Sequence, residues 1–203
     1  MPTDDLKSRK KRGGGNMHEV IWHGRGGQGV VVAAQILAEA AYLEGFKGVT
    51  SAPTFGPERR GAPLTASTRI ADNPIRSFSQ TELADIAVVL DDSLFGVVDI
   101  LGRVRKGGLV IINTAQPPES FKIGDTFGLA TVDAAAIALK QHLIKEGAPV
   151  VNTPMLGAFA RAAGMVSLKN LEKALRGKLS REAVSKNYAA VNAAHDETLI
   201  RGK

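Results

Sequence analysis

A glycine-rich turn near the start of the chain has the residue types and spacing of a phosphate-binding loop. It reads Gly24-Arg25-Gly26-Gly27-Gln28-Gly29 and lies between the apolar run His18 to His23 and the alanine-rich segment Val30 to Leu43. Strand, glycine turn and helix follow one another in dinucleotide-binding folds, where the helix N-terminus offers free N–H groups and partial positive charge to an anion. The same glycines would also let the helix pack tightly on its strand or against another subunit. The turn therefore predicts either anion binding or close packing.

A second unusual segment, Pro57 to Pro63, combines a stiff backbone with one carboxylate and two guanidinium groups. The charged residues are Glu58, Arg59 and Arg60, and prolines and a glycine flank them. Arginine forks bind phosphates and carboxylates through two parallel hydrogen bonds. A surface salt-bridge cluster is the alternative, but such pairs contribute at most about 1 kcal/mol and require no flanking proline or glycine. We expect a contact role for these three residues.

The sequence contains an internal test for a nicotinamide cofactor. A NAD-binding unit places an acidic residue at the end of its second strand, about 20 residues after the glycines, where it holds the ribose hydroxyls. The segment Val49 to Ala52 occupies that region and contains no acid. Arg59 or Arg60 could instead hold a ribose phosphate, as in NADP or coenzyme A. A freestanding NAD(P)-binding oxidoreductase with a Rossmann-like fold therefore stays open as the alternative function.

No catalytic constellation is visible in the rest of the sequence. The histidines lack the spacing of metal ligands: His18, His23, His142 and His195. Without a cysteine or a serine elbow, there is no candidate nucleophile. His23, beside the glycine turn, is the histidine best placed to contact a ligand, although strand-end histidines more often have a structural role. We predict no catalytic residue and no metal site on this chain.

Two apolar runs, Ile86 to Leu90 and Leu109 to Ile112, predict buried central strands that position the candidate site. Polar residues follow both runs: Asp91, Asp92, Asn113 and Thr114. In an open parallel sheet, ligands bind beyond the carboxyl ends of the strands, so these residues belong to the candidate functional edge. Helix N-caps and turn positions are the alternative role for the same side chains.

The remaining pattern predicts one further strand, a hairpin and four helices. Residues 46–50 are expected to form a strand, 51–63 an irregular loop, and 64–70 with 75–78 a hairpin. Helices are predicted over 132–146, 155–163, 168–176 and 181–199, with Thr153, Ser167 and Ser180 as N-caps. The fold class is α/β, with three layers, a mostly parallel central sheet, a β-hairpin excursion and a helical C-terminal third. Residues 1–16 are expected to form a disordered basic tail, and residues 17–203 a single α/β domain.

Composition excludes several classes of protein. The 203 residues include no cysteine, which excludes disulfides, a thiolate zinc site and an iron–sulfur cluster held by this chain. No apolar run approaches the roughly 20 residues of a membrane span and no secretory signal is visible, so we expect a cytoplasmic protein without membrane contact. The net charge is +6, but half of it lies in residues 1–16. We therefore expect no nucleic-acid partner.

The two motifs, in this order, resemble those of the gamma subunit of 2-oxoacid:ferredoxin oxidoreductases of the pyruvate type. The matching residues are Trp22 to Gly29 followed by Phe55 to Pro63. The likeness spans about Val20 to Ser180 and includes four shorter segments: Arg69-Ile70, Pro74 to Arg76, Asp85 to Leu90 and Asn152 to Gly157. The basic N-terminal tail lies outside it.

The resemblance implies an accessory gamma subunit of a complex that oxidatively decarboxylates a 2-oxoacid and passes the acyl group to coenzyme A. The implied partners are alpha, beta and delta-type subunits, with ferredoxin or another acceptor taking the electrons. Thiamine diphosphate, magnesium and iron–sulfur clusters are expected on or with those partners, so this chain would hold no cofactor wholly by itself. Gly24 to Gly29 and Glu58 to Arg60 are expected to face the alpha and beta subunits and to help close the coenzyme A cavity. The resemblance leaves the identity of the 2-oxoacid open.

Overall fold

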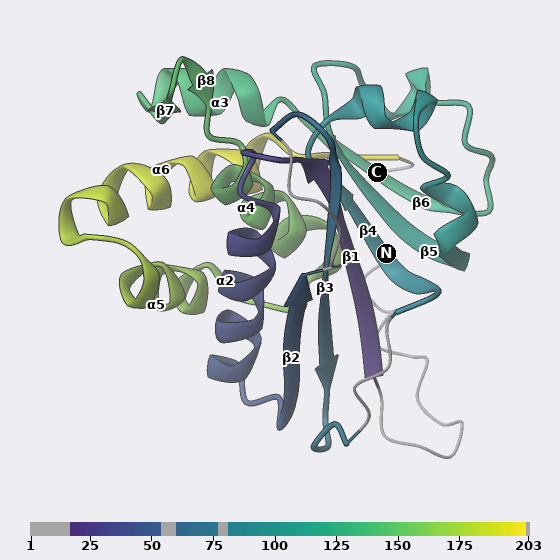
Figure 1. Ribbon diagram of the computed structural model, residues 1–203, viewed down its shortest axis with the longest axis horizontal. Coiled ribbons are helices and arrows are strands. Elements are labelled where there is room, and N and C mark those ends of the chain that lie inside the picture. The colour runs from purple at the N-terminus through teal and green to yellow at the C-terminus, as the bar shows by residue number, and fades with distance from the viewer. Residues whose placement is uncertain (1–16, 54–59, 77–80, 202–203) are drawn as a thin grey trace.

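The computed structural model describes residues 17–53, 60–76 and 81–201. The basic tail, the motif residues Glu58 and Arg59, and positions 77 and 78 of the expected hairpin lie outside the described residues. The central element is a seven-stranded sheet in the order β2-β3-β1-β4-β5-β6-β9 (Figure 1). Its strands are β1 (Met17–Arg25), β2 (Gly48–Pro53), β3 (Pro63–Ala71), β4 (Ala84–Val89), β5 (Val104–Asn113), β6 (Gly128–Val132) and β9 (Leu199–Ile200).

Most strands of this sheet run in one direction. The central strands β1, β4, β5 and β6 are mutually parallel. Strand β3 pairs antiparallel with both β1 and β2, so β2 runs in the same direction as the central strands, while β9 is antiparallel to β6. The expected α/β fold with a mostly parallel sheet is confirmed. The carboxyl ends of β1, β4 and β5 consequently meet at one edge.

One face of the sheet is covered by α-helices, and most of the hydrophobic core lies beneath them. Four long helices gather on this side in Figure 1: α2 (Val30–Leu43), α4 (Asn152–Ala163), α5 (Leu168–Lys178) and α6 (Arg181–Glu197). Trp22 of β1 stacks on Phe159 of α4, with ring centroids 6.3 Å apart. The indole N–H of Trp22 donates to Thr68 on β3 at 3.2 Å. This core fixes the start of α2 and the start of α4 against the same sheet edge.

The opposite face carries a smaller core beneath short 3₁₀ helices. These are η1 (Asp92–Gly96), η2 (Leu101–Arg103) and η3 (Pro118–Ser120). Leu94 and Ile100 pack there against Val89 and Ile112 of the central strands. Because side chains alternate along a strand, Trp22 faces the helices and its neighbour His23 faces this second core. The sheet is therefore the middle of three unequal layers.

Most of the predicted helices are present, but some begin or end at other residues than predicted. The side chains of Ser167 and Ser180 cap α5 and α6, as predicted, by accepting hydrogen bonds from the amides of Asn170 and Ala183. The predicted N-cap Thr153 is wrong, because α4 begins at Asn152 and Val151 occupies the cap position. None of the described helices combines the length and hydropathy of a membrane span.

The predicted hairpin of 64–70 with 75–78 is wrong in its pairing. Strand β3 pairs instead with β2 on one side and with β1 on the other. All of β2, from Gly48 to Pro53, pairs with β3. The predicted loop over 51–63 also begins too early, since residues 51–53 continue β2. Ser51, Ala52 and Pro53 have low strand propensity, so the sequence did not indicate a strand there. Their pairing at the sheet edge is set by tertiary contacts.

The predicted helix over 132–146 is too long at both ends. Val132 ends β6, and the helix itself, α3, is limited to Ala134–Lys140. A small hairpin follows, formed by β7 (Ile144–Lys145) and β8 (Ala148–Pro149). Glu146 and Gly147 form its two-residue turn with φ values of 51° and 78°. Positive φ at both central positions is the geometry of a tight β-hairpin turn, and the helix has already ended at Lys140.

Candidate functional site

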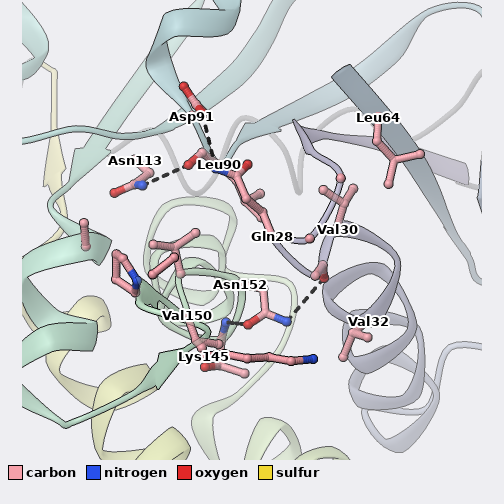
Figure 2. A pocket seen from close by; sticks show the side chains of 18 of the residues that line it. Gln28, Val30, Val32, Leu64, Leu90, Asp91, Asn113, Lys145, Val150 and Asn152 are labelled. Atoms are coloured by element: carbon pink, nitrogen blue, oxygen red, sulfur yellow. Dashed lines mark hydrogen bonds between the residues drawn. The ribbon is translucent and has the colours of Figure 1, made fainter. Parts of the chain in front are cut away.

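A large open cleft lies at the carboxyl ends of β1, β4 and β5. Its volume is about 1370 Å³, and its walls come from the glycine turn, the start of α2, the segment from Arg60 to Thr65, the β7–β8 hairpin and the start of α4. Figure 2 shows Gln28, Asp91 and Asn113 on one side of this cleft and Asn152, Val150 and Lys145 on another. We refer to this space as the cleft. Its position matches the functional edge predicted from the sequence.

The two motifs singled out in the sequence meet at the rim of the cleft. Gly26 forms a parallel β-bridge with Arg60. The Gly26 amide donates to Ala62 O at 2.9 Å, and the Gly61 amide donates to Gly26 O at 3.1 Å. The Arg60 segment is thereby held beside the glycine turn by backbone hydrogen bonds.

Arg25 and Gln28 of the glycine turn are held by a common carboxylate. Arg25 Nε lies 3.0 Å from Asp91 Oδ2, and Gln28 Nε2 donates to the same oxygen at 3.2 Å. The Arg25 guanidinium also donates to Gly61 O at 3.1 Å and to Ser93 Oγ at 2.8 Å. Both candidate side chains are therefore engaged within the chain, where their contacts hold the shape of the turn.

Electrostatics keep Asp91 ionised in this position. Partial burial acts to raise the pKa of Asp91, but hydrogen bonds from Ser93, Gln28 and Arg25, together with the charge of Arg25, outweigh burial. The pKa is therefore lowered from its ordinary value of 3.8. Asp91 also caps η1 by accepting from the Ser93 amide, so it fills the turn role and orders the glycine loop as well.

The N-terminus of α2 opens into the cleft without a side-chain cap. Gly29 is the cap residue in the left-handed conformation, with φ 76°, and no acidic residue lies in the first turn. The first helical hydrogen bond runs from the Ala33 amide to Gly29 O, which leaves the preceding amides without intrahelical acceptors. Asn152 Nδ2 donates to Gly29 O at 3.3 Å, and a Cβ on residue 29 would clash with that nitrogen. Glycine is required there by both conformation and space.

Two cationic side chains, Arg60 and Lys145, line the cleft. Arg60 pairs with Glu146 of the hairpin turn at 2.7 Å, and both side chains are largely exposed, at 74% and 59%. Lys145 lines the cleft from the same hairpin, and in Figure 2 its side chain extends into the space. The ion pair thus links the β7–β8 hairpin to the Arg60 segment.

The other residues predicted at the functional edge either hold the fold together or line the cleft. Asn113 donates to Leu90 O at 2.9 Å and accepts from the Ala134 amide at 2.9 Å, so it joins two strands to the start of α3. Thr114 is buried. Asp92 is exposed and lines the cleft.

His23 does not face the cleft, although it immediately precedes the glycine turn. Its side chain lies on the other face of the sheet, where it is 2% exposed and lines a separate cavity. Burial, followed by the nearby charge of Arg103, lowers the pKa of His23 to about 4, so the imidazole is neutral at physiological pH. Its position does not support contact with a ligand of the glycine turn.

The chemistry of the cleft is that of binding. Among the described residues, no group of histidine or acidic side chains could hold a metal ion. Most of the cleft wall is apolar, and the polar lining consists of the α2 amides, the cations Arg60 and Lys145, three carboxylates and several uncharged polar side chains. Two of the carboxylates, Asp91 and Glu146, are ion-paired with arginines. Such a surface suits an anion attached to a less polar body.

Sequence reasoning missed the hairpin residues Lys145 and Glu146 because it placed them in a helix. Gly147 was the local signal that could have found them, since two-residue hairpin turns need positive φ, which glycine adopts without strain. Ser93 and the contact between Asn152 and Gly29 carried no local signal, because both depend on packing between distant segments.

Comparisons with known proteins agree with this architecture. A family model described as pyruvate ferredoxin/flavodoxin oxidoreductase matches residues 19–197. The chain is 46% identical to the common gamma subunit of pyruvate/ketoisovalerate oxidoreductases of Thermococcus litoralis, over 91% of this chain and 98% of the relative. It is 44% identical to pyruvate synthase subunit PorC of Methanosarcina barkeri, over 79% and 85%. The crystal structure of pyruvate oxidoreductase subunit PORC from Thermotoga maritima superposes with a TM-score of 0.75 at 34% identity, covering 91% of this chain and 98% of that one.

Proposed function

The chain belongs to the pyruvate ferredoxin/flavodoxin oxidoreductase family as a gamma-type subunit, and we propose that its cleft forms part of the coenzyme A site of a 2-oxoacid oxidoreductase complex. The observation that carries the proposal is that the N-terminus of α2, which has no side-chain cap, and Arg60 line the same cleft. Coenzyme A combines phosphates with a long, less polar arm. The helix amides and Arg60 suit the phosphates, and the apolar wall suits the arm.

The size of the cleft supports a binding site that partner subunits complete. Small-molecule sites that enclose their ligand usually measure about 300–1,000 Å³, and this cleft is larger and open to solvent. Apolar side chains remain exposed beside it, including Ile144 at 54% and Val32 at 39%. We assign this rim to contact with alpha- and beta-type subunits, which would narrow the cleft around the cofactor.

Other cofactors of the reaction are assigned to the partner subunits. This chain contains no cysteine to ligate iron–sulfur clusters, and its described residues offer no metal-binding cluster for the magnesium of thiamine diphosphate. The proposed complex contains alpha, beta and delta-type subunits and passes electrons to ferredoxin or a similar acceptor. The gamma subunit would bind coenzyme A and help to close its site, and its partners would carry out the oxidative decarboxylation.

Sheet topology weighs against the alternative of a freestanding NAD(P)-binding oxidoreductase. In a Rossmann fold, the strand after the first helix lies beside the first strand and carries the ribose-binding acid. Here β3 lies between β1 and β2, and β2 stands at the sheet edge. Residues 49–52 also provide no acid. The ribose would therefore lack its usual partner.

Replacement of Arg60 tests the proposal in the assembled complex. In a complex purified through this chain, Arg60→Ala should raise the Michaelis constant for coenzyme A by about tenfold, because a charged hydrogen bond to phosphate is lost. The turnover number at saturating coenzyme A should change little. Arg176→Ala is the matched control, since Arg176 is an exposed arginine on α5 that pairs with Glu172 and does not line the cleft. An unchanged Michaelis constant in an intact Arg60→Ala complex would refute the assignment.

A further inference from the structure

A second cavity lies behind the glycine turn, on the face of the sheet opposite the long helices. Its volume is about 350 Å³, and its lining includes His23, Leu64, Leu94, Val98 and Arg103. Arg60 and the α2 amides are not part of this lining. A ligand in this cavity would therefore not contact the groups proposed to bind coenzyme A.

His23 is the unexplained group in this second cavity. The side chain is buried, at 2% exposure, and neither ring nitrogen has a hydrogen-bond partner among the described residues. A neutral imidazole carries one N–H donor and one nitrogen acceptor. Buried polar atoms of this kind are normally satisfied, because desolvation without a partner is unfavourable. An unpaired imidazole that lines an open space therefore indicates a guest that can hydrogen-bond to it.

The charges around the second cavity define the class of guest. Arg103 donates one hydrogen bond, to Thr81 O at 3.2 Å, and no carboxylate among the described residues lies within ion-pair distance of it. Asp99 also lines the cavity, with one carboxylate oxygen held by the Gly102 amide at 2.9 Å. The Arg103 guanidinium attracts a negatively charged guest, and the Asp99 carboxylate in the same lining repels a second negative charge, so a monoanion fits better than a doubly charged phosphate.

The walls of the second cavity favour an organic anion. Leu64, Leu94, Val98 and Pro63 provide apolar surface, which a short alkyl chain can cover and a bare inorganic ion cannot. We propose that the second cavity binds a short monocarboxylic acid, whose carboxylate accepts hydrogen bonds from Arg103 and from the N–H of His23. Its alkyl group lies against the leucine and valine side chains.

Imidazole NMR of the full chain tests this assignment with propionate as the probe. Long-range ¹H–¹⁵N spectra report the tautomer and hydrogen bonding of each histidine ring, and His23→Leu identifies the His23 signals. Propionate should shift the His23 signals saturably, whereas propionamide and inorganic phosphate should not. His18→Leu is the control, since His18 lies on the same strand outside the cavity lining. It should leave the titration unchanged.

Arg103→Gln supplies the second arm and retains the imidazole. Loss of a charged hydrogen bond to carboxylate should weaken propionate binding by about tenfold or more. Equal affinity in wild type and Arg103→Gln would overturn the proposal. So would His23 signals that respond to none of the probes, which would mean that the cavity holds water alone. Neither result would bear on the Arg60 experiment, because Arg60 lies outside this cavity.

Discussion

Asp91 is the residue on which the shape of the glycine turn depends. Its carboxylate binds Arg25 and Gln28 from the turn and Ser93 from η1, with a side chain that is 20% exposed. Asp91→Asn keeps the size of the side chain but removes its charge. We expect the free energy of unfolding at pH 7 to fall by about 1–2 kcal/mol, because charge-assisted hydrogen bonds become neutral ones. Urea unfolding measures this difference, and Asp92→Asn, at an exposed neighbour, is the control.

The difference in unfolding free energy between wild type and Asp91→Asn should depend on pH. The pKa of Asp91 is lower in the folded chain than its ordinary value of 3.8. The folded state therefore holds its proton less tightly than the unfolded state, and the stabilisation is complete well above pH 3.8. It should be lost as the pH falls through 3.8 towards the lower folded pKa. A stability gap between wild type and Asp91→Asn that widens on acidification would contradict this account.

On the proposed function, Glu146 would compete with the coenzyme A phosphates for Arg60, because the two side chains form an ion pair. The pair is exposed, so its attraction is screened and contributes no more than about 1 kcal/mol. Glu146→Gln removes the competing charge, and the affinity of the purified complex for coenzyme A should rise by about two- to fivefold. Calorimetric titration measures the change, with Glu119→Gln as a control at an exposed glutamate outside the cleft lining. Weaker binding by Glu146→Gln would show that the glutamate serves the ligand directly.

At the scale of the elements, the cleft depends on the close packing of α4 against α6. A Cβ on Gly157 would clash with Val191 O, a backbone atom that cannot move without the helix. Gly157→Ala should therefore destabilise the chain by about 2–3 kcal/mol, despite the higher helix propensity of alanine. Gly177 on α5 has no atom within 4 Å of the position that a Cβ would take, so Gly177→Ala should be neutral or stabilising by up to about 1 kcal/mol. Thermal unfolding compares the two, and equal effects would refute the packing argument.

Elements with strong local signals were predictable from the sequence, and those defined by distant partners were not. The runs Ile86 to Leu90 and Leu109 to Ile112 are apolar enough to specify buried strands without context. Strands β7 and β9 have two residues each, and such short pairings carry no periodicity. The segment 132–146 was predicted as one helix, but α3 ends at Lys140 and the backbone leaves the helical region at His142, where φ is 54°.

At the scale of the whole molecule, the sequence indicated which motifs matter but not how they are joined. The glycine turn and Arg60 lie more than thirty positions apart, and a β-bridge holds them together. Nothing in either motif encodes that bridge, which follows from the placement of β3 beside β1. The sequence also placed His23 next to the turn, whereas strand alternation turns its side chain to the opposite face. Identification of the cleft thus required the fold.

The most direct test of the central proposal is a structure, with coenzyme A bound, of the complex purified through this chain. We expect the cofactor phosphates to lie at the first turn of α2 and beside Arg60, with the remainder of the cofactor running along the apolar wall of the cleft towards a partner subunit. Coenzyme A bound wholly on other subunits, with the cleft filled by protein side chains, would contradict the proposal. In that case the glycine turn would serve subunit packing alone.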